Sequence, residues 1–391
     1  MQDLKELYLE LCMTSLFGAV LEKPLFRHFA DYSRESVGKD EKIRAYSALV
    51  REVYAHGGSL TDLVTKLVLE DENEYVKKRA HAEKIPKEIA AALIHELSVF
   101  ERFCTLTAED FAADMGVAYV SPFSSKKITL SELYEERMRN ISRFGYGIFS
   151  SHPMFRLSDA GEIEPIVSAD KTELSKFVGY GEERGRVIAN TEAFIEGRPA
   201  ANVLLCGDAG TGKSSTVKAI ANGYFERGIR LIELRKDQLR HLPAVMGRIS
   251  ENPLKFIIFT DDLSFNQNDD NFSMLKAALE GSASAKAANA VIYATSNRRH
   301  IVKESFSDRD GDDVHRNDTM QETLSLSERF GLVVLFSKPD KRLYLEIVHE
   351  LARRNGITAE REKLDILAEA FALRRGSRSA RCAEQFIESL M

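Results

Sequence analysis

The sequence predicts an α/β fold: a parallel five-stranded sheet, preceded by a mainly α-helical region and followed by a small helical domain. From about residue 171, short apolar runs alternate with helical stretches. The runs are continuously apolar, which is typical of strands covered on both faces of a parallel sheet. Five of them are expected strands: 202–206, 229–234, 255–262, 289–297 and 332–336. After Pro339, three helical stretches follow, at 340–354, 360–373 and 378–390.

The region before residue 171 has a different pattern. Segments such as DLKELYLELCMTSLF and EIAAALIHELSVFERF repeat apolar residues at helical spacing up to about residue 145. Residues 143–166 mix Gly, Ser, Pro and aromatic residues, which predicts an irregular or hairpin-like linker. We therefore expect three parts: a mainly helical N-terminal accessory domain with its linker (1–170), an α/β core (171–338) and a helical domain (339–391).

Composition narrows the class of protein. The chain has 391 residues, 44% of them hydrophobic and 29% charged, and a net charge of −6. No run is long and apolar enough for a membrane span, and the N-terminus has the pattern of an amphipathic helix rather than a signal peptide. Four scattered cysteines without metal-ligand spacing predict a reducing compartment, with the cytoplasm as the default. Residues 1–170 hold 21 Lys and Arg against 28 Asp and Glu, so nucleic-acid binding is not favoured there.

A glycine-rich loop follows the strand at 202–206. The string GDAGTGKS satisfies the pattern G-x-x-x-x-G-K-[ST], with a strand before it and a helix after it. Glycines let the backbone N–H groups face phosphate oxygens, the lysine supplies a positive charge, and the serine hydroxyl ligates Mg²⁺. This predicts binding of ATP and Mg²⁺. The expected contacts are Gly207, Asp208, Ala209, Gly210, Thr211, Gly212, Lys213, Ser214 and Ser215.

Two acids end the expected strand at 255–262. Ligands of open α/β sheets sit at the carboxyl ends of strands, so Asp261 and Asp262 are placed to act on a bound triphosphate. Asp261 is the candidate for the metal, together with Ser214, and Asp262 is the candidate for polarising the attacking water. The alternative is that both acids only begin the following loop. Because Asp262 is one methylene shorter than the glutamate of many ATPases, hydrolysis is expected to be slow.

In this order the motifs resemble those of the AAA+ ATPase superfamily, over about residues 171–391. The strand ending in ATSN then places Asn297 at the sensor 1 position, which helps to orient the attacking water; a turn-forming asparagine is the alternative. Strings such as NVLLCGDAGTGKSS, DDLSF and LSERFG also resemble a bacterial family of predicted AAA+ ATP-binding proteins with a domain of unknown function.

The resemblance implies three further roles. Arg329, in LSERFG, would be an arginine finger that reaches the γ-phosphate of a neighbouring subunit, which requires a homo-oligomer, either a ring or a transient assembly. Arg381, with Arg378 as the fallback, would be sensor 2 in a C-terminal lid at 339–391. Val178 and Gly179, in KFVGYGEE, would contact adenine. The alternatives are a paired helix-terminal arginine for Arg329 and a solvated basic patch for Arg381.

Three functions remain open. The first is an oligomeric ATPase that remodels or loads a protein client through the N-terminal domain. The second is a nucleic-acid-associated ATPase of the helicase-loader or transposition-helper type, and the third is a slow ATP-dependent switch. Residues 301–325 hold seven acids, three bases and His315, and we expect an interface loop there rather than a metal site. No membrane partner is expected.

Overall fold

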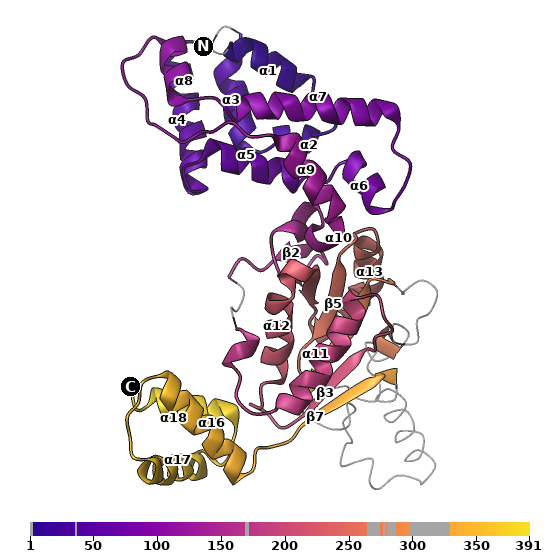
Figure 1. The fold of residues 1–391 in the computed structure, drawn as a ribbon, viewed down its shortest axis with the longest axis vertical. Coiled ribbons are helices and arrows are strands. Elements are labelled where there is room, and N and C mark those ends of the chain that lie inside the picture. The colour runs from indigo at the N-terminus through magenta and orange to yellow at the C-terminus, as the bar shows by residue number, and fades with distance from the viewer. Residues whose placement is uncertain are drawn as a thin grey trace. The chain divides into compact units, whose positions relative to one another are not determined.

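The computed structural model describes residues 3–35, 37–168, 172–263, 274–276, 279, 287–297 and 329–391. The chain divides into two compact units, which Figure 1 shows as ribbons. The first unit contains residues 1–151 and 251–253, and the second contains residues 152–250 and 254–391. Among the described residues, no helix has both the length and the apolar character needed to cross a bilayer.

The first unit is helical, as the sequence predicts. Several helices begin at a side chain that accepts hydrogen bonds from the first turn, among them Asp3, Ser59, Asn73 and Thr107. The elements are α1 (Leu4–Cys12), α2 (Gly18–Leu21), α3 (Pro24–Ser33), α4 (Lys39–Ala55), α5 (Leu60–Leu69), α6 (Glu74–Ala80), α7 (Lys87–Phe103), α8 (Ala108–Met115), α9 (Leu130–Arg139), α10 (Ile141–Phe144) and the 3₁₀ helix η1 (Gly147–Ser150).

One apolar core holds these helices together. Its centre is a set of aromatic rings in mostly edge-to-face contact: Phe17, Phe26, Phe29, Phe100, Phe103 and Phe111. The carboxylate of Glu96, on α7, lies in this core with 4% of the residue's surface exposed. It accepts hydrogen bonds from the backbone N–H groups of residues 15–17, at 3.0–3.1 Å, and so closes the turn between α1 and α2.

The second unit contains a mostly parallel sheet. All five strands expected from the sequence are present: β3 (Val203–Gly207), β4 (Ile229–Glu233), β5 (Lys255–Thr260), β6 (Ala290–Ser296) and β7 (Leu332–Phe336). Their order in the sheet is β4-β5-β6-β3-β7, and all neighbours among them are parallel. The fold prediction is confirmed at this level. Because β5, β6 and β3 are neighbouring parallel strands, their carboxyl ends lie at the same edge of the sheet.

The sheet is larger than predicted, and the boundary between the compact units differs from the expected domain boundary near residue 170. Within the stretch expected to be a linker, β1 (Met154–Leu157) pairs parallel with β4, and β2 (Ile163–Pro165) pairs antiparallel with β1. The sheet therefore has seven strands, in the order β2-β1-β4-β5-β6-β3-β7. Because these two strands hydrogen-bond to the sheet, the second unit begins at His152.

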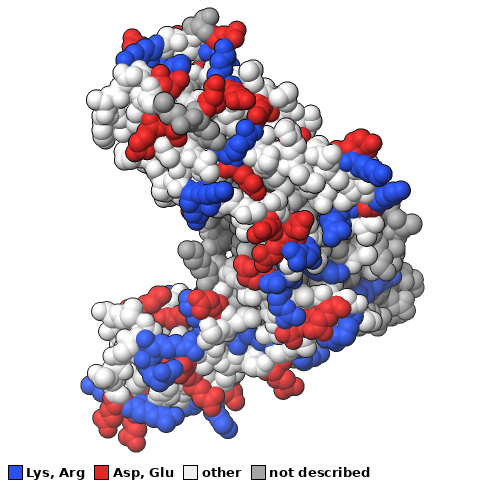
Figure 2. All heavy atoms as spheres, turned by 45° about the horizontal axis from the view of Figure 1, so that its top comes forward, with Lys and Arg blue, Asp and Glu red and all other residues white. Residues whose placement is uncertain are grey.

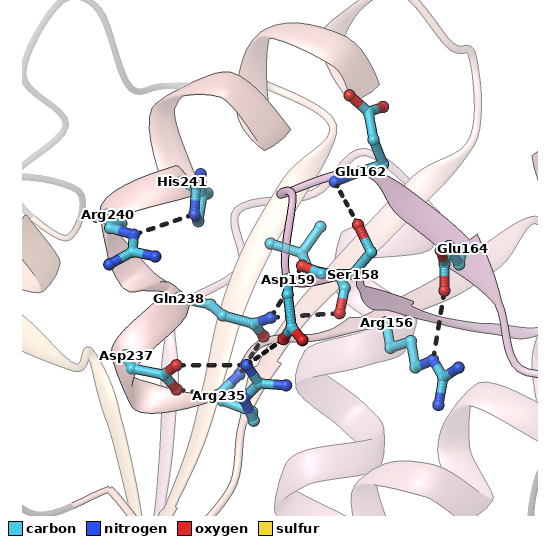
Figure 3. Close-up of polar contacts among 11 residues, drawn as sticks. Arg156, Ser158, Asp159, Glu162, Glu164, Arg235, Asp237, Gln238, Arg240 and His241 are labelled. Atoms are coloured by element: carbon cyan, nitrogen blue, oxygen red, sulfur yellow. Dashed lines mark hydrogen bonds and ion pairs between the residues drawn. The ribbon is translucent and has the colours of Figure 1, made fainter.

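Polar side chains fix this added hairpin to the core, as Figure 3 shows. Gln238, in the 3₁₀ helix η4 (Lys236–His241), donates from Nε2 to the carbonyls of Leu157 and Ser158 at 3.3 and 3.2 Å. Arg235 pairs with Asp159 in the hairpin turn at 2.9 Å. The residues in each of these contacts lie far apart in sequence, so the local pattern of residues 143–166 does not predict the contacts.

Helices cover the sheet and continue into the C-terminal region (Figure 1). The helices α11 (Gly181–Ile195) and α12 (Lys213–Gly223) share a core with one face of the sheet. Residues of the opposite face, such as Leu204 and Ile258, are also buried. The remaining elements are η2 (Leu174–Lys176), η3 (Phe225–Arg227), α13 (Leu242–Ser250), α16 (Lys341–Arg354), α17 (Arg361–Arg375) and α18 (Ala380–Glu388). The last three form a small cluster of their own around Tyr344 and Phe386, which we call the lid.

Candidate functional site

The glycine-rich loop joins β3 to α12 and is shaped by three glycines with positive φ. These are Gly207 (φ +130°), Gly210 (φ +75°) and Gly212 (φ +88°). A Cβ on Gly207 would lie 2.1 Å from the carbonyl oxygen of Phe336, on the neighbouring strand β7, so only glycine fits there. The first backbone N–H groups of α12 have no acceptor within the helix and face outward at its positive end. The loop therefore has the shape of a cradle into which an anion would fit.

Lys213 is held inside this cradle. Its side chain is buried, with 6% of the residue's surface exposed, and burial lowers the pKa of its ammonium group. Nζ donates to the carbonyls of Gly207 and Asp208 at 2.9 and 2.7 Å, and to Oδ1 of Asn297 at 3.1 Å. All three donors of the ammonium thus have acceptors. The acceptors are two loop carbonyls and an amide oxygen just after β6, and none of the three is a carboxylate.

The carboxylate of Asp261 lies beside the loop. Its Oδ1 accepts from the hydroxyl of Ser214 at 2.5 Å and from the hydroxyl of Thr295, on β6. In the described part of the chain no three His, Cys, Asp or Glu residues gather as a metal site. Ser214 and Asp261 together offer a hydroxyl and a carboxylate, which are hard oxygen ligands suited to Mg²⁺ when phosphate and water oxygens complete its shell.

Asn297 links the lysine to the second acid. While its Oδ1 accepts from Lys213, its Nδ2 donates to Oδ1 of Asp262 at 2.8 Å. Asp262 has φ +49°, in the left-handed region, and its N–H donates to the hydroxyl of Thr295 at 2.9 Å. The two acids and Asn297 therefore come from the ends of adjacent strands, as the sequence predicts for their position in the fold. Thr295, which orients both acids, was not among the expected residues, although it stands two positions before Asn297.

The segment before α11 forms one wall of a cavity beside the glycine-rich loop, and Val178 lines this cavity. Gly179 (φ +72°) packs against the lid, where an added Cβ would lie 2.8 Å from Leu343. Arg184, on α11, donates to the carbonyls of both residues, at 3.4 Å to that of Val178. Arg184 and Phe177 also line the cavity, and neither was predicted from the sequence.

The two lid arginines have different surroundings. Arg381, at the start of α18, lines the cavity, and its backbone N–H donates to the carbonyl of Gly210 at 3.3 Å. Arg378 instead forms two hydrogen bonds with the carboxylate of Glu369, at 2.9 and 2.7 Å, and lowers the pKa of that carboxyl group. Of the two candidates from the sequence, Arg381 is the one that lines the cavity.

These groups surround one cavity of about 280 Å³, which we call the loop–lid pocket. Its size is near the lower end of the range for small-molecule sites, and its lining contains both charged and apolar residues. Its lining is Lys176, Phe177, Val178, Arg184, Ala209, Gly210, Thr211, Gly212, Lys213, Ser214, Ser215, Asp261, Asp262, Thr295, Asn297, Ile347, Leu351, Ala380, Arg381 and Glu384.

Some of the predicted residues lie elsewhere or outside the described residues. Gly179, Gly207 and Asp208 are not in the pocket lining, but they shape it; the carboxylate of Asp208 accepts from the N–H of Lys338 at 2.8 Å. Arg329 is half-buried, just before the buried Phe330, and does not line the pocket. The acidic stretch 301–325, with His315, lies outside the described residues.

Comparison with known proteins adds the family. A family model described as "Protein of unknown function (DUF815)" matches residues 150–391. The chain belongs to this family. The match starts close to His152, the first residue of the second unit, and so includes the whole loop–lid pocket. No curated protein matches the chain.

Solved structures give a weaker likeness. The RuvB Holliday junction branch migration motor of Thermotoga maritima is 13% identical, with a TM-score of 0.34, and the match covers 57% of this chain and 72% of that one. A variant of the same protein is 14% identical, with a TM-score of 0.36 and coverage of 57% and 73%. These identities and TM-scores are low. The AAA+-like fold follows instead from this chain's own strand order, its glycine-rich loop after β3 and its helical lid.

Proposed function

We propose that the protein binds ATP with Mg²⁺ in the loop–lid pocket and hydrolyses the ATP. The observation that carries the proposal is one connected set of hydrogen bonds at the carboxyl edge of the sheet. It joins Lys213 and Asn297 to Ser214 and Asp261 through Asp262 and the side chain of Thr295. A phosphate loop alone also occurs in proteins that only bind nucleotides. Here an acid pair and an amide from neighbouring strands lie beside it, which is the set of groups that hydrolysis requires.

The phosphate chain would lie along the N-terminus of α12. Lys213 would exchange its bonds to the carbonyls of Gly207 and Asp208 for bonds to phosphate oxygens, which carry full negative charge. The cost of burying the ammonium, which lowers its pKa, is then offset by an anion instead of by carbonyl dipoles. The base would lie against apolar residues of the pocket lining, such as Val178, Ile347 and Leu351.

The acids would have separate tasks. Ser214 and Asp261 would hold Mg²⁺, which neutralises charge on the phosphates. Asp262 would accept a proton from the attacking water, and Asn297, already bonded to Asp262, would orient that water. Binding of the γ-phosphate by Lys213 would release Oδ1 of Asn297, so the amide would be free to turn toward the water only when a triphosphate is present.

We further propose that the active form is a homo-oligomer. Arg329 does not line the pocket of its own chain, which fits a finger that acts on the site of a neighbouring subunit. Arg381 would act within its own chain, because it lines the pocket beside the loop carbonyl of Gly210. The helical first unit would then receive a protein client that the oligomer remodels or loads.

Two alternatives remain. The first is a nucleic-acid-associated ATPase, which the distribution of surface charge does not favour. The face drawn in Figure 2 has Lys and Arg interspersed with Asp and Glu on each unit, rather than a broad patch of one sign. A slow ATP-dependent switch is favoured by Asp262, whose short side chain starts from a left-handed backbone.

The experiment is a phosphate-release assay on the full chain with Mg·ATP. Asp262→Asn should lower kcat by about 100-fold or more, because a general base is removed while the amide keeps the hydrogen bond to Asn297. Asp237→Asn is the matched control, since Asp237 is an exposed acid that pairs with Arg235 away from the pocket. Asp262→Glu distinguishes the slow switch from the remodelling ATPase: faster turnover in this variant supports the switch, because the short aspartate then limits hydrolysis in the wild type. Unchanged turnover in Asp262→Asn would remove Asp262 from the mechanism.

A further inference from the structure

The backbone just before α11 is held by arginines from both sides. On the core side, Arg184 donates through both terminal nitrogens to the successive carbonyls of Val178 and Gly179. On the lid side, Arg354 of α16 donates to the carbonyls of Lys176, at 2.5 Å, and Ser175, at 3.3 Å. Four carbonyls within five residues thus accept from two guanidinium groups. We call residues 175–180 the strap.

Arg184 is an unusual residue to bury in this place. It has 8% of its surface exposed and no ion pair among the described residues, and burial lowers its pKa to about 10. Its guanidinium carbon lies 4.6 Å from the ring centroid of Phe177 and 5.9 Å from that of Tyr180, so strap rings approach it as well as strap carbonyls. Its buried Nε has no hydrogen-bond partner in the described part of the chain. Burial of a charge without an ion pair is costly, and here the bonds to the strap carbonyls and the approach of the strap rings offset that cost.

The strap has a conformation that needs support. Gly179 and Tyr180 are consecutive residues with positive φ, +72° and +51°, and the second of these is unfavourable for a residue with a side chain. The same strap contributes Lys176, Phe177 and Val178 to the lining of the loop–lid pocket. Phe177 also approaches the phosphate loop, 3.9 Å from where a Cβ of Gly212 would lie.

We propose that Arg184 and Arg354 form a clamp that fixes the strap as the base-binding wall of the pocket, and that the lid contributes to base affinity through Arg354. This inference rests on the proposed function, and both arginines are positioning residues rather than catalytic ones. Arg184 preorganises the strap from the core, and Arg354 joins it to the lid. The clamp therefore acts on the nucleoside part of the ligand and leaves the phosphate cradle unchanged.

The test compares two ligands on each variant of the full chain. Affinities for Mg·ATP and for inorganic tripolyphosphate with Mg²⁺ are measured by displacement of a fluorescent ATP analogue. The quantity of interest is the ratio of the two dissociation constants. This ratio does not change when a variant is partly unfolded, because inactive protein lowers the number of sites for both ligands equally.

Arg184→Met should weaken ATP binding by about tenfold or more, because two charge-assisted bonds that order the strap are lost, and should change tripolyphosphate binding by less than about twofold. Arg354→Met should shift the ratio in the same direction by about threefold or more. The effect is smaller than that of Arg184→Met because Arg354 is exposed, so water can replace part of what its bonds supply. Arg184→Lys, which keeps the charge but can satisfy fewer carbonyls, should fall between wild type and Arg184→Met.

Each arginine has a neighbouring control. The control for Arg184 is Arg186→Met. Arg186 lies two residues further along α11 at an exposed position and donates to the carbonyl of Val333, not to the strap. Arg353→Met is matched to Arg354: both bond to Glu350, whose pKa they lower to about 2, but only Arg354 reaches the strap carbonyls. Both controls should keep the wild-type ratio.

The outcomes separate this inference from the proposed function. An unchanged ratio in Arg184→Met and Arg354→Met, with normal ATP binding, overturns the clamp and leaves the ATP site intact. Equal weakening of both ligands also overturns it, because the arginine then acts on the phosphates or on the fold. If the wild-type chain binds neither ligand, the proposed function itself fails, and the clamp fails with it.

Discussion

At Gly207 the strand β3 leaves no room for a side chain beside β7, and replacement of this glycine by alanine gives a prediction with a magnitude. The added Cβ would lie 2.1 Å from the oxygen and 2.7 Å from the carbon of the Phe336 carbonyl. The backbone at φ +130° is also disfavoured for alanine. To relieve the overlap, β3 and β7 must separate by about 1 Å, since non-bonded carbon and oxygen approach to little less than about 3.3 Å.

Two contributions add up in the loss of folding free energy that this substitution causes. A left-handed or otherwise disfavoured backbone costs about 1–3 kcal/mol. Separation of the strands also weakens the bond from the N–H of Asp208 to the carbonyl of Phe336, now 3.1 Å, by about 1 kcal/mol. The sum, about 2–4 kcal/mol, corresponds to a fall of about 5–15 °C in the unfolding midpoint of a unit of this size.

The assay is thermal unfolding followed by circular dichroism, with Gly247→Ala as the control. Gly247 lies inside α13, and a Cβ there would meet no atom within 4 Å. Alanine in that place should leave the midpoint unchanged or raise it slightly, because alanine is favoured over glycine inside a helix by about 0.5–1 kcal/mol. Equal midpoints for the two variants would refute the account of why the loop begins with glycine.

Three further predictions concern Arg329, Arg381 and Arg378. Arg329→Ala should lower ATP turnover by about 1000-fold, and mixing it with Lys213→Ala subunits should restore part of the activity, because one variant supplies the finger and the other the intact loop; no recovery on mixing would argue against a site shared between subunits. Arg381→Met should weaken ATP binding without changing the unfolding midpoint, whereas Arg378→Met should lower the midpoint and leave ATP binding unchanged. The pKa of Glu369 is lowered chiefly by Arg378, so the stability that this pair supplies is present above the ordinary glutamate pKa and is lost as the pH falls through the lowered value. The midpoints of wild type and Arg378→Met should therefore converge in acid, and a constant difference down to about pH 2 would contradict this.

The parts of the site that could be predicted from the sequence are those with a local pattern. The loop from Gly207 to Ser215 has a fixed spacing between a strand and a helix, and Asp261 and Asn297 end apolar runs. Each of these features is contained within about ten residues, and strand order then brings them together. The five core strands are long and apolar enough to be recognised for the same reason.

The remaining features depend on contacts between distant parts of the chain. The strand β1 has four residues, and it is a strand because it pairs with β4, which lies much further along the chain. Arg354 reaches the carbonyl of Lys176 across 178 positions of sequence. An arginine that donates to backbone carbonyls leaves no local pattern in the sequence, because every residue carries a carbonyl that could accept the bond.

The central claim is that the loop–lid pocket binds the triphosphate of ATP through Lys213, and isothermal titration calorimetry with Mg·ATP tests it most directly. Lys218→Ala is the matched control, because Lys218 lies on the same helix, α12, but pairs with Glu233 instead of facing the loop. Lys213→Ala should weaken ATP binding by about 30-fold or more, as the loss of a buried charged contact implies, while Lys218→Ala binds as the wild type does. Wild-type affinity in Lys213→Ala would contradict the claim.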